Sequence, residues 1–171
     1  VRETGRTVNI TTVMNRNSED PSVWVGVNPS DSTPRIFLAF FTDQSTSDRI
    51  WFTQSIDGTS WDMAYVQVTP NSDPGDGDYY PSIVQVNNDV NKDLVIVFMR
   101  ITSGAINLML TKSTNNGASW SAAVALTSNA GTGIDWAPSL YAHADGRLRL
   151  VWASDTLPFA TTRNVRGILG F

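Results

Sequence analysis

The sequence STNNGASW occupies residues 113–120, and a shorter version of it, SIDGTSW, occupies residues 55–61. Each copy contains a serine, then Asp or Asn, then a glycine, and ends on a tryptophan. Short polar side chains accept hydrogen bonds from turn amides, and glycine adopts the positive φ that a tight hairpin needs. We therefore predict two β-hairpins whose repeated residues are structural rather than catalytic. These residues are Ser55, Asp57, Gly58 and Trp61 in one copy, and Ser113, Asn115, Gly117 and Trp120 in the other.

The two hairpins belong to a longer repeat, which is marked by Pro-Ser pairs beginning at Pro21, Pro81 and Pro138. Each pair is followed by alternating residues, a turn and a dense apolar run rich in Val, Ile, Phe and Trp, which indicates β-strands. A repeated unit of four short strands predicts an all-β fold, a β-propeller built from four-stranded blades. A β-sandwich is the alternative, but it does not require the same turn chemistry to recur at a near-constant interval.

The repeat supplies about three blades per chain in a single domain. We expect an outer strand at residues 7–14 and blades at residues 21–68, 81–127 and 138–171, with residues 163–171 as a third strand of the last blade. Propellers typically have about four to eight blades, so three blades leave an open arc with exposed sheet edges. We expect a homodimer, in which residues 7–14 of one chain pair with residues 163–171 of the other to close a six-bladed ring. The alternative is that the chain is a segment of a longer propeller.

The hairpin sequence resembles the Asp-box, or bacterial neuraminidase repeat, of sialidases: Ser-x-Asp-x-Gly-x-Ser/Thr-Trp. Asn115 replaces the Asp in one copy, and the other copy is one residue shorter between Ser55 and Gly58. The resemblance implies a sialidase-like propeller whose Asp-box hairpins lie away from the ligand-binding face. It also implies an arginine shortly before the innermost-strand proline, where this chain has Glu19-Asp20, Tyr79-Tyr80 and Trp136-Ala137. The resemblance therefore favours the fold and gives little support to sialidase activity.

A ligand site is expected where the segments leading into the innermost strands meet the ends of the second strands, at the mouth of the channel. Two of these segments join a carboxylate to an aromatic residue, Asp78-Tyr79 and Asp135-Trp136. Aromatic rings pack on the C–H faces of sugars, and carboxylates accept hydrogen bonds from sugar hydroxyls. We therefore predict non-catalytic binding of a glycan or another polar ligand. The candidate residues are Asp78, Tyr79, Asp135, Trp136, Asp20, Asp43 and Arg100, the last as a contact for an anion.

Two other functions stay open. A glycoside hydrolase could use Asp20, Asp78 or Asp135, but it would need two carboxylates about 5–9.5 Å apart across the scissile bond. No catalytic residue can be assigned from the sequence. The module could also be purely structural, with the aromatic residues filling the core between blades and the aspartates capping turns.

Composition narrows the range of partners. The net charge of −4 gives no basic field for nucleic acid, and the apolar runs are too short to cross a membrane. The absence of cysteine excludes a disulfide scaffold. We expect no cofactor and assign no metal site, although the acidic, glycine-rich residues 71–78 offer oxygen ligands for calcium. We expect the module to lie outside the cell or at the cell surface.

Overall fold

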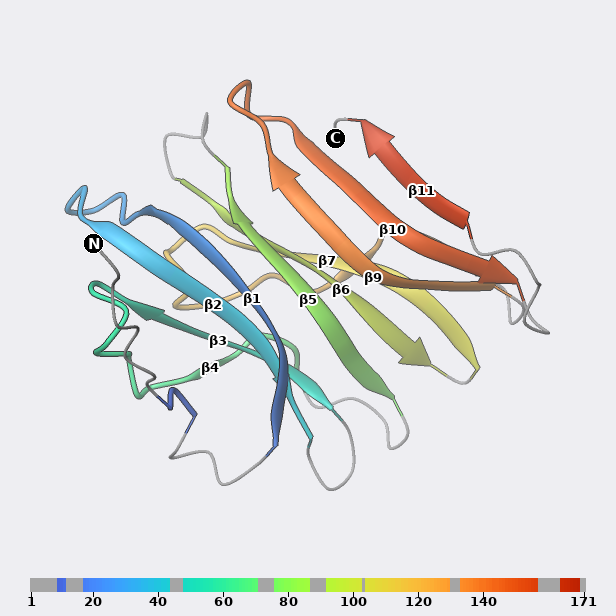
Figure 1. The fold of residues 1–171 in the computed structure, drawn as a ribbon, viewed down its shortest axis with the longest axis horizontal. Helices are drawn as coiled ribbons and strands as arrows, with labels where there is room; N and C mark the ends of the chain where they lie inside the picture. Colours follow the sequence, from blue (N-terminus) through green and yellow to red (C-terminus); the bar gives the residue numbers. More distant parts are fainter. Residues whose placement is uncertain are drawn as a thin grey trace, which may run out of the picture.

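The structure is a computed structural model of the 171-residue chain. It describes residues 9–11, 17–43, 48–70, 76–86, 92–102, 104–129, 133–156 and 164–169. These residues form β-strands and turns (Figure 1). Among them no helix is long and apolar enough to cross a bilayer.

The strands form three successive antiparallel groups in chain order. The first blade contains β1 (Ser18–Val27), β2 (Pro34–Thr42), β3 (Arg49–Ser55) and β4 (Val66–Gln67). The second contains β5 (Gly77–Gln85), β6 (Leu94–Thr102), β7 (Ala105–Ser113) and β8 (Val124–Ala125). The third contains β9 (Gly133–Ala142), β10 (Leu148–Thr156) and β11 (Asn164–Leu169). One parallel pair, Ile106 with Ile134, joins the second and third blades into a continuous hydrogen-bonded sheet.

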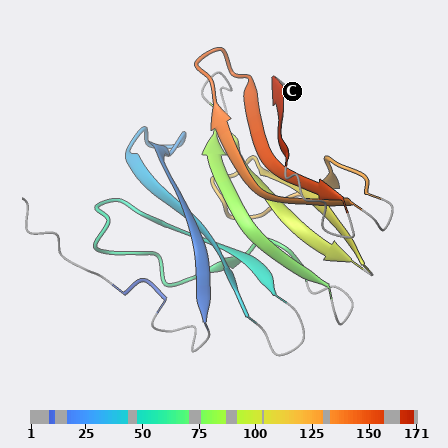
Figure 2. The same ribbon diagram turned by 45° about the vertical axis from the view of Figure 1, so that its right-hand side comes forward.

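The first strands of the three blades lie side by side. β1 contacts β5, and β5 contacts β9, at the front of Figure 1. The later strands of each blade extend away from this row, so that the sheets fan out (Figure 2). This is the arrangement of a propeller, in which the innermost strands surround a channel and the outer strands form the rim. The all-β propeller fold predicted from the repeat is confirmed.

The core lies between blades, because alternate residues of a strand point to opposite faces of its sheet. On β6, Leu94, Ile96 and Phe98 pack toward the first blade, in a cluster with the β2 and β3 aromatics. The intervening residues Val95, Val97 and Met99 pack toward the third blade, in a cluster with β9 and β10. The middle blade is therefore buried on both faces, which explains why its second strand is an uninterrupted apolar run.

Each innermost strand contains a β-bulge at its Pro-Ser pair. Two residues of the strand lie opposite one residue of the next strand, and the residue before each proline has a positive φ. These residues are Asp20 (φ 47°), Tyr80 (φ 51°) and Ala137 (φ 49°). The segments expected to lead into the innermost strands are therefore the first residues of β1, β5 and β9 themselves. The bulge lets the ladder of hydrogen bonds continue through a residue without an N–H group.

The serine of the Pro-Ser pair connects neighbouring blades. Ser22 Oγ accepts a hydrogen bond from the Ile83 N–H at 3.1 Å, and Ser82 Oγ accepts one from the Leu140 N–H at 2.9 Å. The second serine and its donor are the equivalents of the first pair, one blade further along the chain. The recurrence of Pro-Ser thus reflects a repeated contact between blades.

Two expectations about the outer strands have different outcomes. β11 pairs antiparallel with β10, so the third strand expected at residues 163–171 is present at Asn164–Leu169. Of the outer strand expected at residues 7–14, only residues 9–11 lie within the described part of the chain, and they are not in a strand.

Candidate functional site

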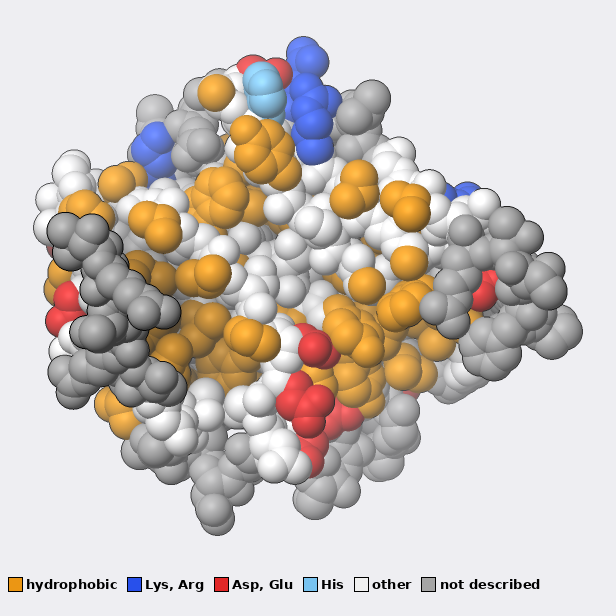
Figure 3. Space-filling view, in the orientation of Figure 1, with side chains coloured by type: hydrophobic (Ala, Val, Ile, Leu, Met, Phe, Trp, Pro, Cys, Tyr) orange, Lys and Arg blue, Asp and Glu red, His pale blue; other side chains and the backbone are white. Residues whose placement is uncertain are grey.

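The candidate site lies at the end of the innermost strands where β1, β5 and β9 begin. β2, β6 and β10 finish at this end, since Ser18 pairs with Thr42 and Gly77 with Ile101. In the space-filling view, apolar side chains are exposed over the row of innermost strands, and a group of acidic side chains lies at the lower edge (Figure 3). The structure therefore brings the predicted residues of the three blades to one end of the fold.

Asp78 and Arg100 form an ion pair across β5 and β6. Arg100 Nε donates to Asp78 Oδ1 at 2.6 Å, and Arg100 Nη2 donates to Oδ2 at 2.9 Å. The hydrogen bonds to Asp78 raise the pKa of the Arg100 guanidinium, while its partial burial acts in the opposite direction. Asp78 is buried, whereas the Arg100 side chain is partly exposed and lies over the Phe98 ring. Arg100 was expected to contact an anionic ligand, but its charge is balanced by Asp78 of the same chain.

Asp135 occupies the equivalent position in the third blade and is also buried. Its Oδ1 accepts a hydrogen bond from Trp152 Nε1 at 3.0 Å, and its Oδ2 accepts one from Asn129 Nδ2 at 2.8 Å. Asn129 also donates to the Ile106 carbonyl, so this network connects the start of β9 with β10 and with the second blade. Both carboxylate oxygens of Asp78 and of Asp135 therefore accept hydrogen bonds from protein groups. These bonds hold the start of each innermost strand in place.

The aromatic residues of the two strands differ in position. Tyr79 packs edge to face on Phe41 of the first blade, with ring centroids 5.2 Å apart. Burial raises the pKa of the Tyr79 hydroxyl, and the nearby Asp48 carboxylate adds to this effect. Tyr79 therefore belongs to the contact between blades.

Tyr80 and Trp136 form an aromatic pair at the surface of the mouth. Their ring centroids are 6.3 Å apart at an interplanar angle of 62°. Trp136 is half-buried and packs against the cluster between the second and third blades. Tyr80 is exposed because the bulge interrupts the alternation of β5 next to the inward-packed Tyr79. Tyr80 was not among the predicted site residues. Its place directly before a repeated proline was the available signal.

Acidic residues of the first blade lie at the same end of the fold as this aromatic pair. Glu19 and Asp20 are exposed at the start of β1, and Asp43 is exposed at the end of β2. Asp43 accepts hydrogen bonds from the Asn17 N–H at 3.3 Å and from Asn17 Nδ2 at 2.8 Å, which ties these two strand ends together. Among the described residues no group of three or more His, Asp or Glu side chains could hold a metal ion. Residues 71–75, most of the segment considered for calcium, lie outside the described residues.

The two repeated hairpins lie at the opposite end of the blades. In the first, the Gly58 N–H donates to Ser55 Oγ at 2.9 Å, and Asp57 Oδ1 accepts from the N–H groups of Thr59 and Ser60 at 2.8 and 2.7 Å. Trp61 Nε1 donates to the Gly58 carbonyl at 3.1 Å. These bonds hold the hairpin in the way its sequence predicts.

The second hairpin repeats this pattern and contacts the first blade. The Gly117 N–H donates to Ser113 Oγ at 2.8 Å, and the Ser119 N–H donates to Asn115 Oδ1 at 2.9 Å. Trp120 packs edge to face on Phe52 of β3, with ring centroids 5.5 Å apart.

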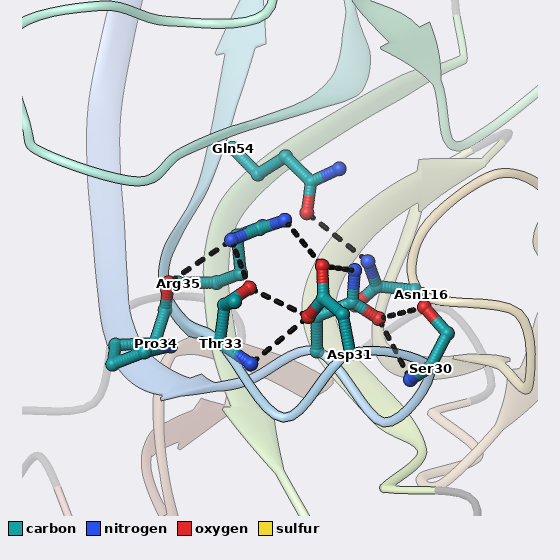
Figure 4. Close-up of polar contacts among 8 residues, drawn as sticks. Ser30, Asp31, Thr33, Pro34, Arg35, Gln54 and Asn116 are labelled. Atoms are coloured by element: carbon teal, nitrogen blue, oxygen red, sulfur yellow. Dashed lines mark hydrogen bonds and ion pairs between the residues drawn. The ribbon is translucent and has the colours of Figure 1, made fainter.

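A polar network lies at this same end of the fold (Figure 4). Asp31, in the turn after β1, accepts from the Thr33 N–H at 2.9 Å and from Arg35 Nη2 at 3.2 Å. Close by, Asn116 Nδ2 donates to Gln54 Oε1 at 3.3 Å, which connects the second hairpin to β3. The network stabilises turns and blade contacts, and it is remote from the mouth.

No family model matches the chain, and comparison with curated proteins finds no match. Solved structures of similar fold do exist. The chain is similar to a thermostable family-43 glycoside hydrolase at 14% identity and a TM-score of 0.58, covering 88% of this chain and 54% of that one. It is similar to an endo-arabinase from Bacteroides thetaiotaomicron at 13% identity and a TM-score of 0.61, covering 95% and 59% of the two chains. It is also similar to an exo-inulinase from Aspergillus awamori at 14% identity and a TM-score of 0.57, covering 92% and 38%.

The chain spans about half the length of the first two of these structures. At such identities the likeness concerns the fold alone. What it shows is that the described blades have the architecture of the β-propellers found among glycoside hydrolases.

Proposed function

We propose that this chain is a non-catalytic binding module for neutral carbohydrate, and that the Tyr80–Trp136 pair at the channel mouth is its contact surface. The observation that carries the proposal is this aromatic pair from two neighbouring blades, an exposed Tyr80 and a half-buried Trp136, at the same end of the fold as the exposed carboxylates of the first blade. Aromatic faces pack on the apolar C–H faces of a sugar ring. Carboxylates such as Asp20 and Asp43 accept hydrogen bonds from its hydroxyls.

The charges at the mouth favour a neutral ligand over an anionic one. Arg100 carries the positive charge predicted for this site, and its guanidinium binds the Asp78 carboxylate. The exposed carboxylates of Glu19, Asp20 and Asp43 repel an acidic sugar. Sialic acid is therefore a poorer candidate than an uncharged oligosaccharide.

We further propose that the hairpins at residues 55–61 and 113–120 are degenerate Asp-boxes of a sialidase-like propeller. The support is geometric. In each hairpin the serine Oγ accepts from the glycine N–H, and the Asp or Asn side chain accepts from a later turn amide. In this proposal the hairpins stabilise the blades and take no part in binding.

The burial of two of the three candidate acids, Asp78 and Asp135, favours binding over hydrolysis. A glycosidase of the usual type needs two carboxylates that face the scissile bond. Asp78 and Asp135 are buried, and both oxygens of each accept hydrogen bonds from protein groups. The hydrolase activities named for the similar structures are therefore a separate outcome to be tested in this chain.

The proposal is tested by an array of neutral oligosaccharides, including arabinan, xylan and inulin fragments, together with sialylated glycans. We expect a neutral ligand to bind. We also expect Trp136→Ala to weaken its affinity about tenfold or more, equivalent to about 1.4 kcal/mol, in isothermal titration calorimetry. Trp61→Ala removes a tryptophan at the opposite end and serves as the matched control.

The proposal fails if no neutral glycan binds, or if Trp136→Ala binds as well as the control while both variants retain the wild-type melting temperature. Release of reducing sugar from a bound ligand, lost in Asp78→Asn or Asp135→Asn with an unchanged melting temperature, would instead establish the hydrolase.

A further inference from the structure

The two terminal blades each expose one face whose equivalents are buried inside the chain. Val23 follows the Pro-Ser pair of β1, and its equivalents are Ile83 on β5 and Leu140 on β9. Val23 is 61% exposed, whereas Ile83 is 2% and Leu140 is 7% exposed. The difference arises because β5 and β9 each pack this face against a preceding blade, and β1 has no preceding blade among the described residues. Val25, two residues further along β1, is exposed on the same face.

The third blade exposes the opposite face. Tyr141 is 54% exposed, while its equivalent on β5, Val84, is completely buried. Val151, directly opposite Ser139 on β10, and Val165 on β11 add further exposed apolar area to this face. Ser139 itself is exposed, whereas Ser22 and Ser82 each accept a hydrogen bond from the next blade.

These two faces are the halves of an interface that the chain already makes twice. In both internal contacts, the Pro-Ser serine of one blade accepts from the N–H group two residues after the proline of the next blade. The residue two positions beyond the serine, Val84 in the middle blade, then packs in one cluster with Leu140 and Ala142 of that next blade. If the third blade made the same contact with a further blade, Ser139 and Tyr141 would lie against Val23 and Val25 of another first blade.

We propose that the third blade of one chain docks on the first blade of a second copy, with Ser139 Oγ accepting a hydrogen bond from the Val23 N–H of that copy. A twofold axis along the channel makes this contact twice and closes a ring of six blades. The contact buries the apolar residues that the separate chain leaves in solvent. The inference does not depend on the proposed sugar binding.

The outer part of the first blade's face is covered in part by the chain itself. Asn9–Thr11 lie beside Leu38 and Phe40, which are buried on this face. The docking surface therefore consists of the innermost-strand positions, which stay exposed. The expected exchange of residues 7–14 onto the outer edge of β11, which has no second partner strand among the described residues, would enlarge the same seam. The proposal does not rest on this exchange.

The test is the mass of the full chain in solution, measured by sedimentation equilibrium. We expect a species of twice the 18.7 kDa chain mass. Val23→Glu and Tyr141→Lys each place a charge in both seams, and each is expected to raise the dimer dissociation constant at least 100-fold. Val124→Glu, a matched change at an exposed valine of β8 outside these faces, should leave the dimer intact.

Mixing the two charged variants provides the decisive measurement. In a mixed dimer, one seam keeps native residues on both sides, and the other brings the new Glu and Lys together. Dimers should therefore reappear in the mixture although neither variant dimerises alone. A wild-type chain that stays monomeric up to about 100 μM would overturn the proposal and favour further blades in a longer polypeptide. It would equally be overturned if the dimer survived both charged substitutions, or if the mixture stayed monomeric while both variants melted like the wild type.

Discussion

Replacement of Gly117 by alanine tests the packing of the second hairpin against the first blade. Gly117 has a φ of +85°, and a Cβ at this position would lie 2.1 Å from a ring carbon of Phe52. A left-handed conformation costs a residue with a Cβ about 1–2 kcal/mol, and overpacking a filled core adds about 1–3 kcal/mol. We therefore expect Gly117→Ala to lower the free energy of unfolding by about 2–5 kcal/mol.

Gly104 provides the matched control for backbone strain. Its φ is +90°, but a Cβ there would meet no atom within 4 Å. Gly104→Ala should therefore cost only the conformational part, about 1–2 kcal/mol. Urea unfolding followed by tryptophan fluorescence measures both variants, and their difference isolates the contact with Phe52. In a Phe52→Leu background this difference should shrink. Equal destabilisation by the two alanines would refute the packing assigned to the hairpin.

Three further changes test the polar contacts of the blades. Ser82→Ala should lower the free energy of unfolding by about 1–3 kcal/mol, because it removes the acceptor of a backbone N–H in the third blade. Ser139→Ala should leave the stability of the monomer unchanged. Equal effects of the two substitutions in urea titrations would contradict the contact. Arg100→Met should cost about 3–5 kcal/mol by leaving the buried Asp78 carboxylate unpaired, and adding Asp78→Asn should recover part of this loss in a double-mutant cycle. The amide N–H groups of Ser60 and then Thr59 hold the pKa of Asp57 below its usual 3.8, so its ionised form stabilises the fold above that pH and loses this effect as the pH falls below it. The stability advantage of the wild type over Asp57→Asn should therefore be constant above about pH 5 and decline below about pH 4, and a constant difference across this range would contradict the assignment.

The features that could be predicted from the sequence are those with a local physical cause. The hairpins follow from glycine at a positive φ and from Asp or Asn side chains that bond to amides a few residues away. The blades follow from the apolar runs and from the interval between the Pro-Ser pairs. Neither inference requires knowledge of which strands lie opposite one another.

The features that could not be predicted depend on register and on contacts between blades. Pairing of Asp78 with Arg100 requires the alignment of β5 with β6, over a separation of 22 residues. The repeated proline marks the position of the bulge, but the exposure of Tyr80 depends on the register of β5 with β6 around it. The role of Ser22 depends on a donor 61 residues away, in the next blade. The sequence therefore predicts the repeat, whereas the contacts between strands and between blades that explain the repeated residues are seen only in the structure.

The proposed site and the proposed seam are separable, because Tyr80 and Trp136 come from the second and third blades of the same chain. The aromatic pair is complete before any second copy binds, and a closed ring would carry it twice, related by the twofold axis. A monomeric Val23→Glu variant should therefore bind a neutral glycan with the affinity of the wild type, at one ligand per chain, in isothermal titration calorimetry. If the monomeric variant instead lost binding, the ligand would have to span both chains, and the contact surface would lie across the channel rather than on this pair. If Trp136→Ala abolished binding while the dimer persisted, the aromatic pair would serve the ligand and not the assembly.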